Sequence, residues 1–545
     1  MLRNAGTAVR ILIAYDELDR PPHKLSVNQK PEAVAPEGTQ ASPEVNPAGI
    51  PPRATAASRL SILKWLAQFG PTLFWIFVAA LAFHVAYAAS RTSLLVVVYL
   101  FALLQLARIG GWRNAYYSGL AVGFLIAAVR LAFFWRIFSA GSVALWYVYA
   151  FWIGIFVAVA GAWLRRWTVR TEAGAMKAPA GWTWLLIPFL WTGLEYFRSE
   201  LYYLRFSWLS PGYAFADAPW QMPLRQVGAY GLCFLLMAIA CAAALFWQRS
   251  RLCALAMLVA GTGCLRLWGG APDQGATHPG KTVRIAGVQM EQPTEPEVMN
   301  RLTALLRKQP DTELIVLSEY TFNEPIPAKV KDWCRKNGRY LIVGGTEPAP
   351  GSNYSNTAFV IGPDGDIVFR QVKSVPIQFF KDGLPAREQA LWESPWGKLG
   401  LCICYDLSYR RVTDRLVGLG AQGVIVPTMD VMDWGQTQHE LHARVAPTRA
   451  AEYGIPIFRL ASSGISQWVS PSGGVLGTAP CPGDGAVLAG VLELGEAGRL
   501  PLDHWLAPVA VGVSGVMILW LLLWRGWGKG SGRAGFQPGA RIGGD

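Results

Sequence analysis

A succession of apolar segments, each of about 20 residues, is the feature that most constrains how this chain of 545 residues can fold. A helix of that length crosses the hydrocarbon core of a membrane. The predicted spans cover residues 71–89, 92–108, 115–135, 143–164, 181–197, 227–247, 250–267 and 505–524. Burying so many apolar helices in a soluble protein would need a core far larger than this chain can surround. The sequence therefore predicts a bundle of membrane-spanning helices.

The composition supports this prediction. Hydrophobic residues make up 52% of the chain and charged residues only 16%, and 24 residues are Trp, a residue type enriched at membrane interfaces. The formal net charge of +13 could suggest a nucleic-acid-binding protein. However, the basic residues lie in short clusters beside apolar segments, and no nucleic-acid-binding motif accompanies them. We therefore expect no nucleic-acid partner.

The basic clusters predict how the bundle is oriented in the membrane. If eight spans alternate in direction, all the clusters fall on one side, which the positive-inside rule makes cytoplasmic. The clusters are Arg53, Arg59 and Lys64; Arg108 and Arg113; Arg165, Arg166, Arg170 and Lys177; Arg249 and Arg251; and Arg525, Lys529, Arg533 and Arg541. The polar region between the last two spans then faces outward. So does the loop from Arg198 to Arg225.

Five aromatic residues of this outward loop are expected to lie at the lipid surface, where amphipathic rings are favoured. They are Tyr202, Tyr203, Phe206, Trp208 and Tyr213. The chain as a whole divides into five parts by composition. These are a disordered cytoplasmic tail (1–58), a transmembrane bundle of about seven spans (59–270), a polar domain (281–496), a C-terminal transmembrane helix (505–525) and a second cytoplasmic tail (526–545).

The polar domain alternates strand-like and helix-like segments. Strands are predicted at residues 283–290, 313–319, 340–345, 398–406, 423–428, 455–461 and 464–470, and helices at 295–308, 328–337 and 440–453. A hairpin with Asp-Gly at its tip is predicted at residues 362–366. Such alternation is typical of a layered α/β domain.

Glu319, Lys373 and Cys404 each stand at a predicted strand end, where the catalytic groups of α/β domains gather. Taken singly, each has an ordinary explanation as a solvated carboxylate, a surface lysine or a core cysteine. Together they form a chemical set. A thiol needs a base before it can act as a nucleophile, and a carboxylate can serve as that base. A neighbouring lysine can stabilise the oxyanion of a tetrahedral intermediate.

The segments that carry these residues resemble the nitrilase superfamily, whose members use a Glu–Lys–Cys triad in this chain order. The matching segments are VRIAGVQM, IVLSEYTF with Glu319, VFRQVKSVP with Lys373 and GLCICYDLSYRR with Cys404. Cys404 rather than Cys402 matches the family nucleophile, because Tyr405 and the acidic Asp406 follow it. The resemblance implies an α-β-β-α sandwich beside the helical membrane bundle.

The membrane-embedded arrangement resembles one branch of that superfamily, the apolipoprotein N-acyltransferases. WTGLEYFRSE, FSWLSPGYAFADAP and VGAYGLCFLL resemble its membrane segment and outward loop, and QHELHARVAPTRAAEYGIPIFRLASSGISQWVSPSGG resembles its segment after the nucleophile. The resemblance implies an acyltransferase that takes a fatty acyl chain from a phospholipid onto Cys404 as a thioester. The fatty acyl group is then transferred from Cys404 to the N-terminal amine of a lipoprotein that carries a diacylglyceryl-Cys.

In these implied roles Glu319 takes the thiol proton and later the proton of the amine, while Lys373 and the Tyr405 N–H stabilise the oxyanion. The resemblance implies no metal and no organic cofactor. Nothing in the sequence demands an oligomer, so we expect a monomer. The implied location is the bacterial inner membrane, with the catalytic domain on the periplasmic face.

The supporting residues of the site depart from the family pattern. Asp406 stands where the family usually has Glu. Gln378 and Asp382, in VPIQFFKDGLP, stand where the family has Val-Pro-Phe-Gly-Glu, and Trp434 is shifted within TMDVMDWG. Together with Tyr405, these residues are predicted to bind substrate or to support the oxyanion. The departures leave the identity of the amine acceptor open.

Three other functions compete with this interpretation. A membrane-anchored amidase of the nitrilase type could use the same triad on C–N bonds, although one anchoring helix would suffice for it. A catalytically inactive scaffold is disfavoured by the intact triad. A transporter is disfavoured because few charges lie within the spans, Glu195 and Arg198 being exceptions.

Overall fold

The computed structural model describes residues 56–170, 176–179, 181–270 and 280–530. Residues 1–55 and 531–545, which make up most of the two predicted cytoplasmic tails, lie outside the described part. The chain from Leu63 onward forms one compact unit by its contacts.

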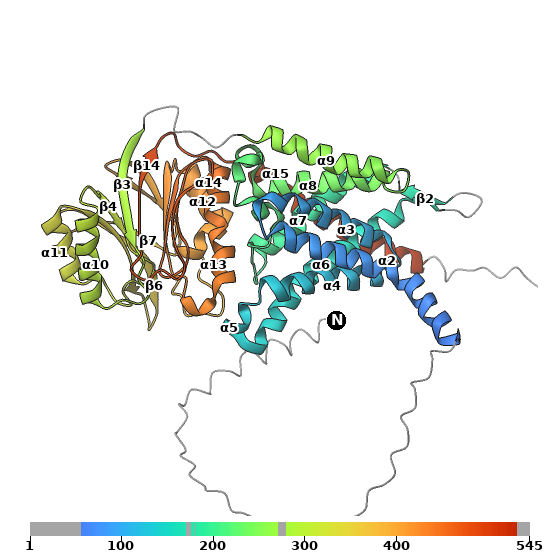
Figure 1. The fold of residues 1–545 in the computed structure, drawn as a ribbon, viewed down its shortest axis with the longest axis horizontal. Coiled ribbons are helices and arrows are strands. Elements are labelled where there is room, and N and C mark those ends of the chain that lie inside the picture. Colours follow the sequence, from blue (N-terminus) through green and yellow to red (C-terminus); the bar gives the residue numbers. More distant parts are fainter. Residues whose placement is uncertain (1–55, 171–175, 180, 271–279, 531–545) are drawn as a thin grey trace, which may run out of the picture. The chain divides into compact units, whose positions relative to one another are not determined.

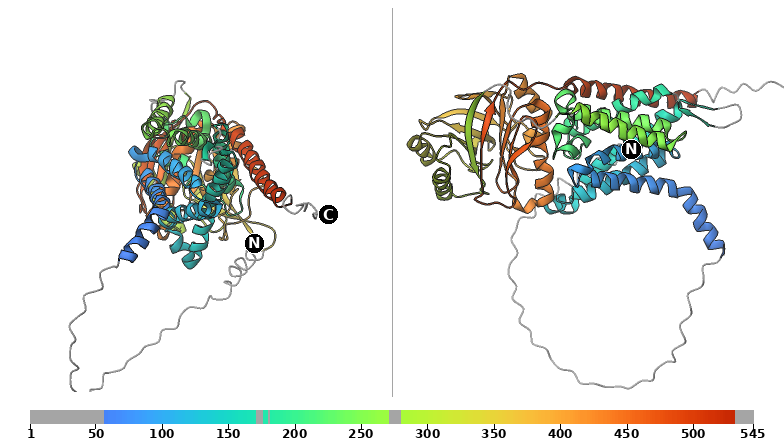
Figure 2. Two further views of the ribbon diagram at one scale, coloured as in Figure 1. Left: turned by 90° about the vertical axis from the view of Figure 1, so that its right-hand side faces the viewer. Right: turned by 45° about the horizontal axis from the view of Figure 1, so that its top comes forward.

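The first half of the described chain is helical (Figure 1). Its longer helices are α2 (Ala56–Ala86), α3 (Val96–Arg108), α4 (Trp112–Arg130), α6 (Ser142–Arg166), α7 (Ile187–Tyr196), α8 (Leu224–Phe246) and α9 (Arg251–Trp268). Short helices connect them: η1 (Ser90–Leu95), α5 (Phe134–Phe138), η2 (Ser139–Gly141), η3 (Gly181–Leu186), η4 (Phe197–Leu201), η5 (Pro211–Phe215) and η6 (Pro219–Gln221). A small antiparallel pair joins β1 (Thr168–Arg170) to β2 (Met176–Pro179). The long helix α15 (Asp503–Gly530) follows the polar domain and lies alongside α7 and α8 (Figure 2).

Six helical segments of the described chain are long and apolar enough to cross a membrane. They are Phe69–Ala86, Ser90–Arg108, Phe134–Arg166, Leu224–Phe246, Arg251–Trp268 and Asp503–Trp524. Of the eight spans predicted from sequence, the remaining two coincide with α4 and with the composite of η3, α7 and η4. The first is less apolar, since it begins with Trp112, Arg113 and Asn114, and the second is broken into three short helices.

Small residues bring these two elements against longer helices. A Cβ added at Gly123 would lie 2.6 Å from Cα of Ala150, and one added at Gly154 would lie 3.0 Å from the Tyr116 carbonyl oxygen. The earlier residue of α4, Tyr116, thus faces the later residue of α6, Gly154, so the two helices run antiparallel. A Cβ at Gly193 of α7 would collide with the backbone of α15. Close backbone approach at small residues is how helices associate within membranes.

The polar domain contains two six-stranded sheets. One has the strand order β14-β3-β4-β5-β6-β7, formed by Val487–Leu494, Lys281–Val288, Leu314–Val316, Tyr340–Pro348, Tyr354–Ile361 and Ile367–Val372. The other has the order β13-β12-β11-β10-β9-β8, formed by Val475–Ala479, Ser466–Val469, Ile457–Ala461, Gly423–Thr428, Gly397–Leu401 and Leu391–Ser394. Both are mixed sheets, with parallel pairs at β3-β4-β5 and at β9-β10-β11.

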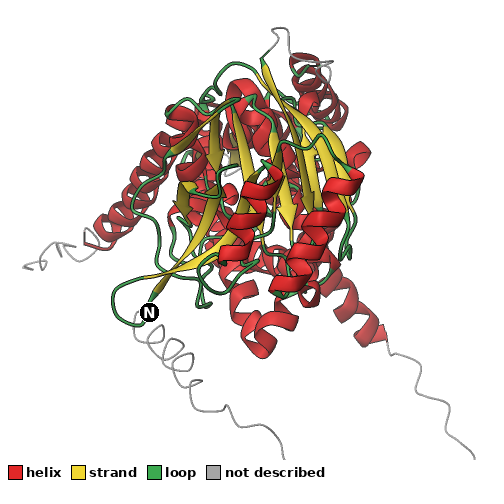
Figure 3. Cartoon of the chain, turned by 90° about the vertical axis from the view of Figure 1, so that its left-hand side faces the viewer, coloured by secondary structure: helices red, strands yellow, loops and turns green. Residues whose placement is uncertain are grey.

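The sheets stack face to face, with helices on both outer faces (Figures 1 and 3). In β3, Val283 and Ile285 belong to the core between the sheets, whereas Ala286 and Val288 belong to a second core under α10 (Glu295–Lys308) and α11 (Ala328–Asn337). This alternation follows from the two-residue period of a strand. The helices α12 (Arg410–Gly418), α13 (Gln436–Ala443) and α14 (Val445–Tyr453) cover the other sheet. The predicted α-β-β-α sandwich beside a membrane bundle is confirmed.

The polar domain is attached to the bundle at one end of a single strand pair. β3 and β14 run antiparallel in a register that pairs Lys281 with Leu494. The chain therefore enters the domain after α9 and leaves it before α15 at adjacent positions. The helix predicted at residues 440–453 is two helices, α13 and α14, that meet at Arg444.

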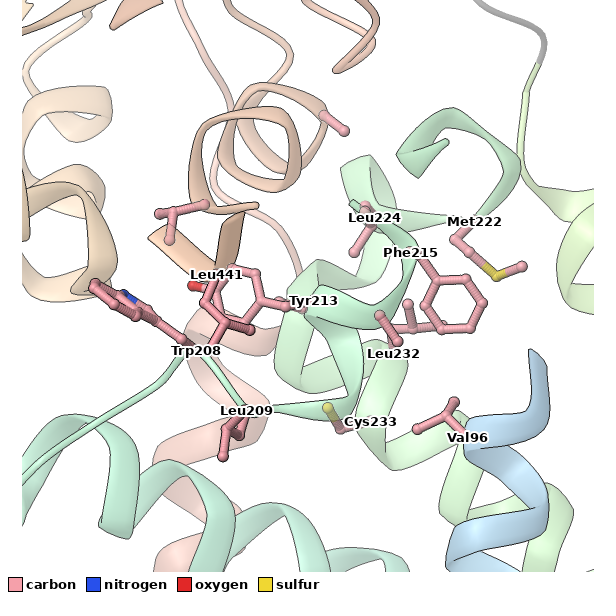
Figure 4. Close-up of a cluster of buried hydrophobic side chains, with 14 of the residues drawn as sticks. Val96, Trp208, Leu209, Tyr213, Phe215, Met222, Leu224, Leu232, Cys233 and Leu441 are labelled. Carbon is pink, nitrogen blue, oxygen red and sulfur yellow. The ribbon is translucent and has the colours of Figure 1, made fainter. Parts of the chain in front are cut away.

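The loop between α7 and α8 differs from the prediction. Trp208 is only 5% exposed and Tyr213 only 2%, so neither lies at a lipid surface. Figure 4 shows Trp208, Leu209 and Tyr213 beside Leu441 of α13. The prediction was wrong because aromatic composition alone does not distinguish a membrane interface from an interface between two packed parts of a protein. Tyr203 of the same loop is exposed.

Candidate functional site

Glu319, Lys373 and Cys404 come from three separate segments of the sandwich. Glu319 lies three residues after the end of β4, and Lys373 follows β7 directly. The strand that precedes the nucleophile, β9, ends at Leu401, so Cys404 does not end a strand as predicted but begins the short helix η7 (Cys404–Ser408). All three side chains are buried.

The carboxylate of Glu319 is held by three donors. Its Oε1 accepts hydrogen bonds from Lys373 Nζ at 2.7 Å and from Asn356 Nδ2 at 2.6 Å. Its Oε2 accepts one from the Met429 N–H at 2.9 Å. The Lys373 ammonium also contacts Asp382 Oδ2 at 2.7 Å. The lysine thus bridges two carboxylates.

The nucleophile candidate has a strained backbone. Cys404 has φ of 51°, in the left-handed region that costs an ordinary residue of order 1–3 kcal/mol. Tyr320, next to Glu319, and Phe379, in the loop after Lys373, also have positive φ. Backbone strain of this kind concentrates at functional sites. The strained turn directs Sγ of Cys404 toward the Met429 carbonyl oxygen, 3.6 Å away.

Burial and charge set the protonation states of the three groups. Burial raises the pKa of the Cys404 thiol well above its ordinary value, and the charge of Glu319 adds to this effect. Burial also raises the pKa of Glu319, although Lys373 opposes that shift. For Lys373, burial disfavours the charge, but Glu319 and Asp382 more than offset it and raise its pKa. A neutral thiol thus shares the site with the carboxyl group of Glu319 and the ammonium of Lys373, and a thiol needs a base before it can act as a nucleophile.

Asp382 and Asp406, two predicted supporting residues, are both part of this site. Asp382 accepts hydrogen bonds from Tyr320 OH at 2.9 Å and from the Ile377 N–H at 2.8 Å, in addition to its contact with Lys373. Asp406 accepts from the Ser374 N–H at 3.0 Å and from the N–H groups of Val375 and Ile403. Because it joins the segment after Lys373 to the turn of Cys404, Asp406 orients two triad segments toward each other. Burial raises its pKa to about 6, although Lys373 opposes that shift.

A buried polar network lies behind the Met429 peptide. Asp430 accepts a hydrogen bond from His442 Nδ1 at 2.8 Å and pairs with Arg459. Burial opposes the ionisation of Asp430, but His442 and Arg459 more than offset it and lower its pKa. Since Met429 contacts both Glu319 and Cys404, this network positions the peptide that orients the base.

The turn of the nucleophile is also held by the helical bundle. Trp208 Nε1 donates to Ser408 Oγ at 2.9 Å, and its ring stacks on His442 with centroids 4.7 Å apart. Arg449 donates to the carbonyl oxygen of Ser408 at 2.9 Å and forms an ion pair with Glu200 of η4. The position of Cys404 therefore depends on the bundle as well as on the sandwich.

An apolar cavity lies where the bundle meets this turn. Its lining comes from α5, α6, the loop between α7 and α8, the loop after Lys373 and the helix η8 (Met432–Trp434). The lining residues are Leu131, Phe133, Phe134, Ile137, Phe138, Leu145, Val148, Tyr149, Arg198, Leu204, Arg205, Phe206, Trp208, Ile377, Gln378, Phe379, Phe380, Tyr405, Trp434 and Gln438. Tyr405, the residue after the nucleophile, connects this cavity to the triad.

Comparison with known proteins separates the chain into two matched regions. Residues 79–242 match the apolipoprotein N-acyltransferase N-terminal domain, and residues 284–495 match the carbon-nitrogen hydrolase family. The two matches together show an apolipoprotein N-acyltransferase-like protein of the carbon-nitrogen hydrolase superfamily.

Individual relatives agree with this family assignment. An apolipoprotein N-acyltransferase of Shewanella oneidensis is 25% identical over 417 residues, which cover 68% of this chain and 78% of that one. A second, from Geobacter metallireducens, is 25% identical and covers 57% of this chain and 68% of its own length. An omega-amidase of Danio rerio is 28% identical but matches only 23% of this chain and 50% of its own. Similarity to acyltransferases thus extends into the bundle.

The structure also places the remaining predicted residues. Gln378, Tyr405 and Trp434 line the apolar cavity. Among the described residues, no group of three or more His, Cys, Asp and Glu side chains is arranged to hold a metal ion.

Several site residues were not predicted. Asn356, Arg205 and His442 carry no motif that distinguishes them in sequence. Asn356 stands between two other polar residues, Ser355 and Thr357, in strand β6, so its strand does not single it out. The structure buries it completely between the carboxylates of Glu319 and Asp382.

Proposed function

We propose that this chain is a phospholipid-dependent N-acyltransferase that modifies lipoproteins through a thioester on Cys404. The observation that carries the proposal is the position of the apolar cavity. It is lined jointly by bundle helices and by Tyr405, next to the nucleophile. The family assignment supports the same reaction, because relatives named as apolipoprotein N-acyltransferases match both regions of the chain.

The first half-reaction forms the acyl-enzyme. Glu319 takes the thiol proton as Cys404 Sγ attacks the ester carbonyl of the phospholipid. Lys373 and the Tyr405 N–H stabilise the oxyanion of the tetrahedral intermediate. When the ester C–O bond breaks, the lysophospholipid oxygen takes the proton from Glu319, and the acyl group stays on sulfur as a thioester.

The second half-reaction transfers the acyl group to nitrogen. The N-terminal amine of the lipoprotein attacks the thioester carbonyl and passes a proton to Glu319. The C–S bond then breaks, and Cys404 recovers its proton. Water would compete with the amine, so its exclusion by the apolar lining favours transfer over hydrolysis.

The cavity suits the carboxyl end of an acyl chain. Its free volume is about 120 Å³. Its lining is mostly apolar, which suits the first methylene groups of a fatty acyl chain. The remainder of the chain would extend along the exposed apolar surface into the lipid.

We further propose an eight-span topology in a bacterial inner membrane, with the sandwich on the periplasmic side. Six helices meet the length and composition of a span. Since α4 runs antiparallel along α6, it traverses the same depth. The composite of η3, α7 and η4 packs along α15, a candidate span, in the same way. With eight spans, the basic clusters fall on one face, which is the cytoplasmic face by the positive-inside rule.

Intact mass spectrometry of the membrane-purified protein, beside Cys404→Ala, tests the mechanism. We expect a fatty-acyl adduct on the unaltered protein after incubation with phospholipid, lost on treatment with hydroxylamine and absent from the variant. Adding a diacylglyceryl-Cys peptide should discharge the adduct and yield an N-acylated peptide. An adduct on Cys404→Ala, or none on the unaltered protein, would contradict the mechanism. Discharge by water alone would instead indicate a hydrolase.

A further inference from the structure

The apolar cavity beside Cys404 contains an arginine whose charge is not neutralised. The charged residues in its described lining are Arg198 and Arg205. Arg198 forms an ion pair with Glu195 at 2.6 Å and donates to the Phe206 carbonyl oxygen at 2.7 Å. By contrast, the guanidinium of Arg205 forms no hydrogen bond or ion pair with any residue that the structure describes, and its Nε is buried. A cation in such surroundings favours an anionic ligand.

The position of Arg205 is fixed relative to the nucleophile. The hydroxyl groups of Tyr405 and Tyr409 both donate to the carbonyl oxygen of Arg205, at 3.3 Å each. The guanidinium lies over the ring of Tyr409, 5.2 Å from its centroid. Because Tyr405 follows Cys404 directly, two hydrogen bonds from the nucleophile's own turn and the adjoining residue hold this arginine in place.

The same loop is held from the opposite side. Gln378 Nε2, in the segment after Lys373, donates to the Tyr203 carbonyl oxygen at 3.3 Å. The loop that carries Arg205 therefore lies between the two segments that supply the lysine and the nucleophile of the triad. A ligand bound to Arg205 would be positioned against both.

We propose that Arg205 binds the phosphate of the glycerophospholipid acyl donor while the donor's acyl chain enters the cavity. This inference rests on the proposed acyltransferase function. The scissile ester and the phosphate are attached to the same three-carbon glycerol, so a phosphate at Arg205 brings the ester carbonyl toward Cys404. A guanidinium presents paired N–H donors that match phosphate oxygens and is more weakly hydrated than an ammonium, which suits an apolar cavity.

The rim of the cavity indicates a lipid as the source of the phosphate. Tyr203, Phe379 and Phe380 are 76%, 54% and 40% exposed and lie around the segment that carries Gln378. Exposed aromatic side chains of this kind belong at the membrane–water interface, the depth at which phospholipid headgroups lie. A soluble phosphate compound would gain nothing from such a rim.

The site distinguishes the donor from the acceptor. The diacylglyceryl group of a lipoprotein carries two acyl chains but no phosphate. Arg205 therefore acts in the first half-reaction, in which the phospholipid acylates Cys404. It does not act in the second, in which the amine attacks the thioester.

The experiment compares two donors that differ only in the phosphate headgroup. Dipalmitoyl phosphatidylglycerol and dipalmitoylglycerol are each mixed with the full-length protein in detergent micelles, and acyl-enzyme formation is followed by intact mass spectrometry. For Arg205→Gln, we expect the ratio of the two acylation rates, phospholipid over diacylglycerol, to fall about tenfold to a hundredfold. That is the range for losing hydrogen bonds to a charged group. In Arg205→Lys this rate ratio should fall less, because the lysine keeps the positive charge.

Arg136→Gln is the matched control. Arg136 lies exposed on α5 and is not part of the cavity lining, so the variant removes the same charge near the membrane without touching the proposed site. Its rate ratio should stay within about twofold of that of the unaltered protein.

Each other outcome overturns the inference. An unchanged ratio in Arg205→Gln, an equal loss with both donors, or the same fall in Arg136→Gln would each show that Arg205 does not recognise phosphate. If the unaltered protein is not acylated by the phospholipid at all, the proposed function fails, and this inference fails with it. Acylation of the unaltered protein with no change in Arg205→Gln overturns the inference alone.

Discussion

Asp382→Asn tests whether the second carboxylate on Lys373 makes Glu319 a stronger base. Two oxygens that each lie 2.7 Å from the same Nζ are at most 5.4 Å apart, so the charges of Glu319 and Asp382 repel each other closely. That repulsion contributes to raising the pKa of Glu319. At an effective dielectric constant of about 20, two unit charges at this distance interact by about 3 kcal/mol.

Removing the charge of Asp382 therefore leaves Lys373 to neutralise Glu319 alone, which weakens the base. If the transition state of proton transfer feels about half of the 3 kcal/mol, acylation of Cys404 slows about tenfold, since each 1.36 kcal/mol is a factor of ten. If the amide oxygen keeps the contacts of Oδ2 with Lys373 and the Ile377 N–H, the NH2 group replaces Oδ1 and points a donor at Asn356 Nδ2, a donor whose hydrogen bond Asp382 now accepts. The slowing should thus be at least tenfold.

Quenched time courses of acyl-enzyme formation, read by intact mass, measure this rate. Asp484→Asn is the control, because Asp484 pairs with Arg301 at 3.5 Å on the exposed surface, where such pairs contribute little. Thermal unfolding should show both variants folded. Acylation of Asp382→Asn at the unaltered rate would refute the electrostatic reasoning, as would an equal loss in Asp484→Asn.

Three further outcomes follow from the same geometry. Gly344→Ala should slow acylation strongly, because the added Cβ would lie 2.6 Å from Cα of Glu319. Gly495→Ala is the control and should keep the acylation rate, because open space surrounds Gly495. Equal acylation rates in the two variants would contradict this reasoning. Asp430→Asn leaves Arg459 buried without its partner and should lower the free energy of unfolding at neutral pH by about 3–5 kcal/mol. The pKa of Asp430 is lower in the folded protein than in the unfolded chain. The stability that the Asp430 charge contributes is therefore fully present above the unfolded pKa and is lost as pH falls through the folded pKa. The melting curves of Asp430→Asn and of the unaltered protein should thus converge in acid. The acylation rate should fall as pH drops through the pKa of Glu319, with a midpoint above the ordinary 4.5, and a pH-independent rate would exclude Glu319 as the base.

The fold was predictable in outline because its signals are local. Helix α10 was predicted at the residues it occupies, since its apolar positions recur with helical spacing and Val298, Leu302 and Leu305 are buried. The end of β9 was less predictable. The apolar run continues to Cys404, but the chain leaves the sheet after Leu401 to form the strained turn. Periodicity reports burial, and burial here continues past the end of the strand.

The surroundings of the triad were not predictable to the same degree. Trp208 was assigned to the lipid surface because aromatic composition fits that environment. The structure instead stacks it on His442, a residue 234 positions later, in contact with the nucleophile's turn. Nothing in the neighbouring sequence of either residue indicates the other.

The sequence by itself determined the apolar spans, many of the strands and helices and the three residues proposed for the chemistry, because each depends on residue identity and local spacing. It did not predict the strands β8, β13 and β14 or the helix α12. Only the tertiary structure decided which charges are neutralised. The pairing of β6 with β7 brought Asn356 beside Lys373, the loop after Lys373 brought Asp382 to the same ammonium, and Arg205 was left without a carboxylate partner in an apolar cavity. The physical reason is that burial and Coulomb energy depend on distances in space, and the folding of the bundle against the sandwich sets those distances between residues far apart in the chain.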